Sequence, residues 1–543
     1  MSLILKDLIE RGYFPQELPP PFRTESFSNF VHAGGSLPGY IPPPNTPGQK
    51  QVAGLGQTNS IPGVYNLARV GLLRRVLSIP NPVHFLKLAE YVVTNWAKIS
   101  THFGTTSLSL SIPTLGSEGR AIARRDTLAG RASKKVEVRS KGRYLVIADI
   151  ARFYPGIYTH SIPWAIDGKA IAKKNRKKST LGNDIDALVR NCQGQQTNGI
   201  PIGPDTSLLI AEIILSKVDE KIVAKGYTGF RYVDDYELVF NTKEEAQRAL
   251  DDLQQLLFEY ELYLNPSKSM VLELPQRFED EWISELRTFE INPESRGFRT
   301  ALIHFFDRAF ELSRKYPTEN ILKYASGRVS FTDIHADDYA FIEDLLIQCA
   351  RVEAGALPIV LRSVLKFGAT DQNRKEVREN LMNWIIREHA PQRHTSEVAW
   401  ALWACVTLKF KLSEDVCKLI VLMEDSICAL LLLHARSEGL VPIAKLLDPL
   451  AAVLNGAALY EDRWMLAYEA ETRGWLTSKS GQSMVDADPN FSLLKTANVS
   501  FYDESKTVIS EDDDELEYYY ISRLETGDYN EDEDEDELAK LFT

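Results

Sequence analysis

The stretch YTGFRYVDDYELVF, Tyr227 to Phe240, places two adjacent carboxylates, Asp234 and Asp235, inside a run of strand-forming residues. Two apolar and aromatic runs joined by two turn-compatible residues predict a β-hairpin with the aspartates at its tip. Such a hairpin presents its carboxylates instead of burying them. An ordinary Asp-Asp turn is the alternative, because Asp tolerates turn dihedral angles well.

A third carboxylate, Asp149, ends the buried strand that RYLVIADI predicts for Tyr144–Ala148. Phosphoryl transfer with two metal ions needs a few fixed oxygen ligands that hold two Mg²⁺ ions about 3.5–4 Å apart. Asp149, Asp234 and Asp235 would supply such a set. The sequence therefore predicts a magnesium site at the ends of two core strands.

The bulk composition indicates a globular protein. A chain of 543 residues with 44% hydrophobic residues can bury a sizeable core and suggests two or three domains. The five cysteines are scattered without CxxC spacing, which favours a reducing compartment over a disulfide framework or a zinc site. Charged residues near the N-terminus and the shortness of the longest apolar run, ICALLLLHA, predict a cytoplasmic protein without a membrane span.

Charge is unevenly distributed along the chain. From Asp503 onward there are 17 acidic and 3 basic residues, which accounts for the net charge of −13 and leaves the preceding body nearly neutral. Within that body, GRAIARRDTLAGRASKKVEVRSKGR from Gly119 and GKAIAKKNRKK from Gly168 are strongly basic. Two basic clusters beside one candidate site favour a polyphosphate or nucleic-acid groove, and solvated basic faces are the alternative.

The texture of the sequence changes along the chain and predicts four parts. Residues 1–65, rich in Pro and Gly, predict an extended arm packed on the domain that follows. Residues 66–285 alternate helical and strand patterns, whereas 286–480 show apolar helical periodicity typical of stacked helical pairs of the HEAT type, or of a helical bundle. Residues 481–543 form an acidic tail too charged to fold alone.

Four motifs then occur in a characteristic order: DIARFY from Asp149, QQTNGIPIGPDTS (Gln195–Ser207), YVDD (Tyr232–Asp235) and LNPSKS (Leu264–Ser269). Over about residues 1–275 the chain resembles reverse transcriptases. Three segments are similar in sequence to the bacterial abortive-infection and defence-associated reverse transcriptases: GYFPQELPP, FYPGIYTHSIPWAIDGK and GIPIGPDTS. The resemblance implies an α+β fold, with a fingers and palm domain followed by an all-α, HEAT-like repeat domain and a disordered acidic tail.

The resemblance also implies roles for the acidic residues. Asp149 and Asp234 would bind two Mg²⁺ ions together with the backbone carbonyl of Ile150, and Asp235 would give electrostatic support. Lys268 would protonate the leaving pyrophosphate or neutralise its charge. An inactive palm that serves as a nucleic-acid-binding module or toxin scaffold is the alternative function.

Further residues would bind the nucleotide. Tyr154 occupies the place of the steric gate, whose ring clashes with a ribose 2′-OH, so dNTPs are the expected substrates and DNA the product. Arg120 matches the arginine that grips the triphosphate, although Arg124 and Arg125 are close by. Gly199, Pro201 and Gly203 would let the backbone approach the template–nucleotide pair.

The second motif departs from the common PQG pattern, because Ile202 replaces the glutamine. The loss of that polar contact argues against ordinary template copying and fits the abortive-infection subgroup, some members of which polymerise without a template. Two kinds of synthesis stay open: copying of a noncoding RNA template, and untemplated, protein-primed synthesis of single-stranded DNA. For protein priming the candidate hydroxyls are Tyr518, Tyr519, Tyr520 and Tyr529 in the acidic tail, with docking of the tail as the alternative.

The helical part offers no second active site by its motifs. His394, near a helix start, is interpreted as a cap or surface residue. Because stacked helices present broad surfaces, this part is expected to act as a scaffold, either by assembling a homo-oligomer or by holding a nucleic-acid product.

Overall fold

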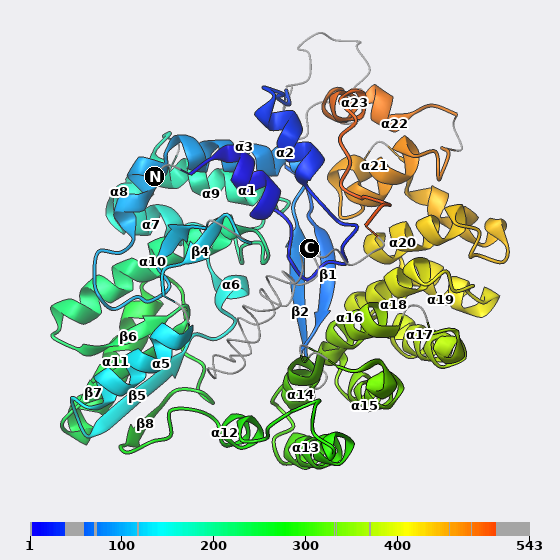
Figure 1. Cartoon of the computed structure of the whole chain (residues 1–543). Helices are drawn as coiled ribbons and strands as arrows, with labels where there is room; N and C mark the ends of the chain where they lie inside the picture. The colour runs from blue at the N-terminus through cyan, green and yellow to red at the C-terminus, as the bar shows by residue number, and fades with distance from the viewer. Residues whose placement is uncertain are drawn as a thin grey trace, which may run out of the picture.

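The computed structural model describes residues 3–38, 59–69, 73–116, 119–126, 128–176, 178–330, 332, 334–368, 371–455, 457–478 and 481–506. The four candidate priming tyrosines and most of the acidic tail lie outside these residues. Figure 1 shows a mixed α/β part at one side, a helical part at the other, and the β1–β2 hairpin between them.

A four-stranded antiparallel sheet is the centre of the α/β part. Its strands are β5 (Tyr144–Asp149), β6 (Thr228–Tyr232), β7 (Asp235–Phe240) and β8 (Met270–Glu273), in the order β6-β7-β5-β8. Leu145, Val146 and Ala148 of β5 are completely buried. A central strand without polar side chains in its middle is typical of a sheet covered by helices.

Helix α11 packs against β5, β7 and β8, and its start is defined by a capping box in which Thr242 and Glu245 satisfy each other's backbone N–H groups. Helix α5 packs against β6 and β7. The helices of this part are α3 (Pro82–Thr94), α4 (Trp96–Ile99), α5 (Leu128–Arg139), α6 (Phe153–Gly156), α7 (Ser161–Asp167), α8 (Lys169–Lys174), α9 (Leu181–Asn191), α10 (Asp205–Ala224) and α11 (Lys243–Phe258), with a small hairpin of β3 (Pro113–Leu115) and β4 (Ile122–Arg124).

The described N-terminal residues contribute α1 (Leu5–Arg11), α2 (Glu25–His32) and the hairpin of β1 (Gly63–Ala68) and β2 (Arg74–Ile79). They are tied to the C-terminal end of the described chain. The backbone N–H of Arg23 donates to Phe501 O at 3.1 Å, and Phe22 forms an isolated bridge with Tyr502. The N-terminal segment therefore packs directly against the last described residues.

Helices dominate from residue 281 onward. Helix α18 is buried along almost its whole length and contacts α16, α17, α20 and strand β1, which explains why its sequence is apolar on all sides. The helices are α12 (Glu281–Arg287), α13 (Phe298–Lys315), α14 (Ile321–Ser330), α15 (Tyr339–Val352), α16 (Leu357–Gly368), α17 (Lys375–His389), α18 (Thr395–Thr407), α19 (Glu414–Met423), α20 (Ser426–Ser437), α21 (Trp464–Thr472), α22 (Met484–Ala487) and α23 (Pro489–Thr496). Short 3-10 helices include η5 (Ala390–Gln392), η6 (Ala444–Val453) and η7 (Ala458–Tyr460).

Hydrogen bonds connect the helical part to the β1–β2 hairpin and to the loop that follows it. The indole N–H of Trp464 donates to Ile79 O at 3.1 Å, and the Asn81 amide donates to Leu459 O at 2.7 Å. Ala68 N–H donates to Ser396 Oγ at 3.0 Å. Among the described helices, none combines the length and apolar character that crossing a bilayer requires.

Candidate active site

The three predicted carboxylates meet at one end of the central sheet. Asp149, the last residue of β5, is the Cα partner of Asp235, the first residue of β7, and Asp234 immediately precedes Asp235. Asp149 is 8% exposed, and the two others are half-buried. The antiparallel register thus brings together residues that are far apart in the sequence.

The hairpin turn differs by one residue from the sequence prediction. Tyr232 pairs with Asp235, so the turn residues are Val233 and Asp234, not the two aspartates. Val233 has a φ of 48°. That left-handed conformation is strained for a β-branched residue and costs about 1–3 kcal/mol, so surrounding contacts must impose it.

Two contacts hold the strained turn on either side of Val233. Its backbone N–H donates to the hydroxyl of buried Ser111 at 2.7 Å, and its carbonyl accepts from Arg231 Nη1 at 2.8 Å. Both groups come from neighbouring elements and not from the turn itself. The position of the Asp234–Asp235 pair is therefore determined by tertiary contacts.

Arg231 belongs to a buried charge network with α10. Its guanidinium contacts Glu212 at 2.8 Å and Asp219 at 2.7 Å, and all three side chains are at most 2% exposed. The Tyr236 hydroxyl donates to Asp219 Oδ1 at 3.0 Å. Because every charge has a close partner, the network can hold the hairpin against α10 without an isolated buried charge.

Two cations lie beside the carboxylates. Arg131 Nη2 donates to Asp235 Oδ2 at 3.1 Å, and its guanidinium lies 5.0 Å from the centre of the Tyr232 ring. Lys268 Nζ lies 3.6 Å from Asp149 Oδ2, and the lysine side chain is 60% exposed. Lys268 was predicted from the sequence, whereas Arg131 was not, because its only signal there is membership of the basic cluster from Gly119.

Further along α5, Arg139 forms a buried ion pair with Glu237 at 2.9 Å. Lys135 lies 3.8 Å from the same carboxylate. Burial, and then the nearby charge of Arg131, lower the pKa of the Lys135 amine. Helix α5 thus lays a row of cations against the strand that carries Asp235.

The motif that bears Lys268 runs alongside the end of β5. Asn265 N–H donates to the carbonyl of Asp149 at 2.8 Å, and Ile150 forms an isolated bridge with Leu264. Asp149 N–H donates to Ser269 Oγ at 3.3 Å. These contacts explain how a lysine 119 positions away comes to lie beside Asp149.

Tyr154 and the second motif are also neighbours. Tyr154 is half-buried in α6, and its carbonyl accepts from Ile200 N–H at 3.1 Å. Gly199 has a φ of 85°, and a Cβ there would lie 3.2 Å from the carbonyl oxygen of Pro155. The glycine thus permits the close approach of the two segments.

The neighbouring residues of the second motif are held from the other side. The carbonyl of Ile202 accepts from Ser78 N–H of β2 at 2.8 Å, and the carbonyl of Pro201 accepts from the Ser207 hydroxyl. The β1–β2 hairpin therefore touches the segment that was predicted to contact the nucleotide.

Arg120 lies in a different set of contacts. It forms an ion pair with Asp205 at 2.5 Å, donates to Phe14 O at 2.9 Å, and donates to the carbonyl of Gly203. These three partners belong to the N-terminal segment and to the second motif. Binding of a triphosphate by Arg120 therefore stays a prediction.

The donor set suits a hard divalent cation. Asp149, Asp234 and Asp235 offer carboxylate oxygens, which Mg²⁺ prefers, and the backbone carbonyl of Ile150 follows Asp149 directly in the chain. The three carboxylates lie at the same end of the sheet, where a bound divalent cation would reduce the repulsion between their charges. Their assignment as metal ligands stays a prediction.

One comparison with known protein families gives a match that spans these residues. Residues 87–294 match the family model for reverse transcriptase (RNA-dependent DNA polymerase), so this part of the chain carries a reverse transcriptase domain. The matched segment includes Asp149, Tyr154, Asp234, Asp235 and Lys268. In sequence, the chain matches no curated protein.

Two solved telomerase structures were also found. Telomerase from Candida albicans, in complex with the TWJ fragment of telomeric RNA, is 11% identical with a TM-score of 0.28, over 60% of this chain and 65% of that one. Apo telomerase from Candida tropicalis is 13% identical with a TM-score of 0.27, over 66% of this chain and 72% of that one. This chain thus spans less than two thirds of the Candida albicans chain.

Proposed function

We propose that the protein is a Mg²⁺-dependent DNA polymerase of the reverse transcriptase superfamily that acts in antiphage defence of the abortive-infection type. The observation that carries the enzymatic part is the pairing of Asp149 with Asp235 beside Asp234, inside the segment that matches the reverse transcriptase model. The resemblance of the motif sequences to those of bacterial defence enzymes supports the proposed role in antiphage defence.

Each residue then has a defined task. Bound Mg²⁺ would activate the attacking hydroxyl and stabilise the pyrophosphate charge. Asp149, Asp234 and the carbonyl of Ile150 hold the cations, while Arg131 balances the charge of Asp235 at 3.1 Å. Lys268, largely exposed and 3.6 Å from Asp149, can move toward the leaving group and donate a proton to it.

Substrate selection involves the second motif. Tyr154 would exclude ribonucleotides, and Gly199, Pro201 and Ile202 would line the base-pair side of the nucleotide. Because Ile202 lacks the side-chain amide of glutamine, it can neither donate to nor accept from a template pair. This favours untemplated, protein-primed synthesis of single-stranded DNA over ordinary template copying, and copying of a noncoding RNA stays the second variant.

The helical part is proposed to be a scaffold. We assign the arm to 1–65, fingers and palm to 66–285, a HEAT-like domain to 286–480 and the tail to 481–543. The first part of this tail departs from the sequence expectation, because it folds as α22 and α23 and packs against the N-terminal segment. Each helix from α14 to α19 packs against the next helix or the next but one, which supports stacked helices. Assembly into a homo-oligomer is supported by exposed Val352 and Leu422, whereas Trp400 and Trp403 are buried within the chain itself. Light scattering of nuclease-treated protein tests this, and a monomer contradicts it.

The deciding experiment is incorporation of dNTPs in the presence of Mg²⁺. Asp234→Asn should abolish incorporation with no loss of folding, because one metal-binding charge is removed from the turn. Asp251→Asn, at an exposed position of α11, is the matched control and should behave like the wild type. Retained synthesis by Asp234→Asn would refute the assignment.

The alternative function is a catalytically silent palm that binds nucleic acid or acts as a toxin scaffold. Wild-type protein that binds nucleic acid but incorporates no nucleotide, with any primer or none, would favour it. Sequencing the nucleic acid that co-purifies with the protein separates the two polymerase variants, since it identifies an RNA partner, the DNA product and any attachment to protein.

A further inference from the structure

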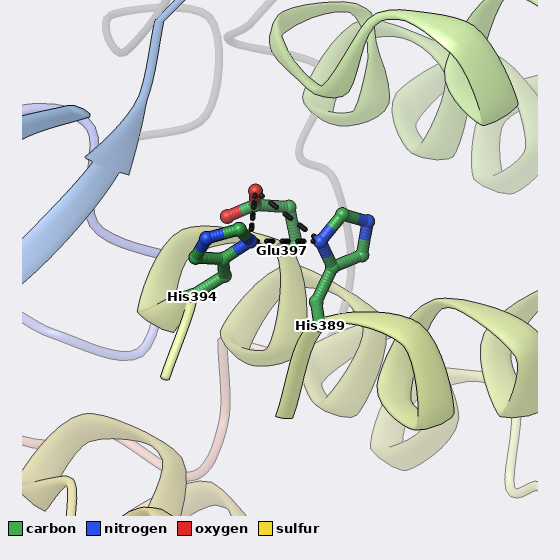
Figure 2. A group of neighbouring side chains, drawn as sticks. All are labelled: His389, His394 and Glu397. Atoms are coloured by element: carbon green, nitrogen blue, oxygen red, sulfur yellow. Dashed lines mark hydrogen bonds and ion pairs between the residues drawn. The ribbon is translucent and has the colours of Figure 1, made fainter. Parts of the chain in front are cut away.

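Two histidines and a glutamate converge far from the central sheet, in the helical part. His389 ends α17, His394 immediately precedes α18, and Glu397 lies in the first turn of α18. The intervening chain turns back through η5 and through Arg393, whose φ is 56°. Figure 2 shows the two imidazole rings and the carboxylate directed toward one another.

His394 differs in part from the sequence expectation. It occupies the N-cap position of α18, but its side chain makes no capping hydrogen bond. Its Nδ1 lies instead 3.0 Å from Nδ1 of His389. Each of these nitrogens is 3.6 Å from Oε1 of Glu397.

Hydrogen bonding alone accounts for only part of this arrangement. One proton can lie between the two ring nitrogens, but at 3.6 Å neither nitrogen makes a hydrogen bond with Glu397. In a tetrahedral zinc site with bonds of about 2.0–2.1 Å, two ligand atoms lie roughly 3.3 Å apart. The separations here, 3.0 Å between the two nitrogens and 3.6 Å from each nitrogen to Glu397, are close to that distance.

Hydrogen bonds from neighbouring side chains hold the Glu397 carboxylate in place. Glu397 is 2% exposed, and it accepts hydrogen bonds from Arg74 at 2.6 Å and 2.8 Å and from Ser396 at 2.5 Å. Partners of this kind orient metal-binding side chains. Because each carboxylate oxygen has two lone pairs, Oε1 can keep its bond to Arg74 and still face the histidines.

The two rings can be reached from solvent and are suited to bind a metal. Each histidine side chain is 17% exposed, so a small ion has access to the Nδ1 atoms. Burial lowers the pKa of both imidazoles, which favours the neutral form that metals require. The guanidinium of Arg74 opposes a cation, but its charge is already balanced by Glu397.

We propose that His389, His394 and Glu397 form a binding site for one Zn²⁺ ion, with water as the fourth ligand. Two imidazoles and one carboxylate fit zinc better than Mg²⁺, which prefers oxygen ligands alone. The site is distinct from the three aspartates and independent of the proposed polymerase function. All five cysteines are buried in the structure, so they offer no competing surface site.

The position of the site indicates a structural role. Glu397 is bound to Arg74 of β2, and Ser396 accepts from Ala68 N–H of β1. The same hairpin donates from Ser78 N–H to the carbonyl of Ile202. A zinc ion would therefore link the end of α17 to the start of α18. This is where the helical part binds the β1–β2 hairpin, which in turn contacts the second motif.

Zinc binding can be measured on the full-length chain without an affinity tag. Asp234→Asn serves as the background, and excess Mg²⁺ is present, so that the aspartate site does not contribute. After chelation and dialysis, Zn²⁺ is added and the bound metal is determined by elemental analysis. We expect one equivalent per chain, and a thermal unfolding midpoint that rises with zinc concentration.

Matched variants locate the ion. His389→Gln and His394→Gln should each lower the zinc affinity by about 100-fold or more, since loss of even an outer partner of a metal ligand costs about 10- to 100-fold. His335→Gln is the control, because His335 is exposed and pairs with Glu294 elsewhere. Far-UV circular dichroism checks that each variant is folded.

Three results would overturn the proposal: no stoichiometric zinc in the background protein, unchanged binding in a folded His394→Gln variant, or equal loss in His335→Gln. Should the cluster variants fail to fold, Co²⁺ loading of the background protein decides instead. Visible absorption bands of tetrahedral Co²⁺ with nitrogen and oxygen ligands support the site, and their absence refutes it.

Discussion

Arg231 and Asp219 form an ion pair of 2.7 Å in which neither side chain is exposed to solvent. Burial alone would lower the pKa of Arg231, but attraction by Asp219 and Glu212 raises it well above its ordinary value, so the guanidinium stays charged. The same guanidinium donates to the carbonyl of Val233. A buried ion pair between β6 and α10 is thus directly connected to the turn that carries Asp234.

Replacement of Arg231 by Leu should reduce the free energy of unfolding by about 3–5 kcal/mol, because it leaves Asp219 and Glu212 buried without their partner. Urea unfolding measures this loss. Arg143→Gln is the control: Arg143 pairs with Glu273, but its side chain is 69% exposed, and its loss should leave stability essentially unchanged. Equal effects of the two variants would show that the buried network does not stabilise the palm.

Ser111→Ala should weaken both the fold and nucleotide incorporation. It leaves the partly buried N–H of Val233 without its acceptor, which costs at most about 1–3 kcal/mol, and it loosens the strained turn. Ser109 gives a matched control two residues away. It is 2% exposed and its hydroxyl has no hydrogen-bond partner among the residues that the structure describes, so Ser109→Ala should be neutral or slightly stabilising.

Stopped-flow incorporation and urea unfolding of the two alanine variants test the role of Ser111. If Ser111→Ala loses stability but keeps the wild-type incorporation rate, then Ser111 supports the fold without positioning the carboxylates. If both variants lose equal stability, the hydrogen bond to Val233 is not the cause.

The carboxylate positions were predictable because their local sequence agrees with their structure. Asp149 ends an apolar strand, and an Asp-Asp pair between two strand-forming runs predicts a hairpin. The exact turn was not predictable, because Val233 adopts a positive φ that its side chain disfavours. Hydrogen bonds with Ser111, which is distant in sequence, and with Arg231, which buried partners on α10 hold in place, override that preference.

Side chains that meet only through tertiary contacts could not be paired from the sequence. Arg131 is 104 positions from Asp235, and the basic cluster around it has many equally plausible cations. His389 and His394 are close in sequence, yet only the turn at Arg393 brings their rings together. Spacing alone does not distinguish such a pair from two surface histidines.

Tyr154 gives a test of sugar selection. Its ring lies 5.1 Å from that of Phe153 and is half-buried, so it is held in place without being enclosed. Tyr154→Ala should raise ribonucleotide incorporation relative to deoxynucleotides, whereas Tyr154→Phe should keep the wild-type preference because it keeps the ring. Competition assays with paired dNTP and NTP substrates measure the ratio. Equal ratios in all three proteins would place the selection elsewhere.

Glu353 should make stability depend on pH in the helical part. Its carboxylate accepts from the backbone N–H groups of Leu322 and Lys323 at 2.9 Å and 3.0 Å, at the start of α14. Burial raises its pKa from 4.5 to about 7. The folded chain therefore binds this proton more tightly than the unfolded chain does.

The sign of the effect follows from that difference. Below about pH 4.5 the carboxyl is protonated in both states, and its contribution to stability is fully present. Between pH 4.5 and about 7 only the folded state keeps the proton, so the contribution falls as pH rises, by about 3 kcal/mol in total. Glu353→Gln cannot titrate. Urea unfolding at pH 5 and pH 8 should therefore show a wild-type stability that falls relative to the variant at the higher pH, and a constant difference would contradict the raised pKa.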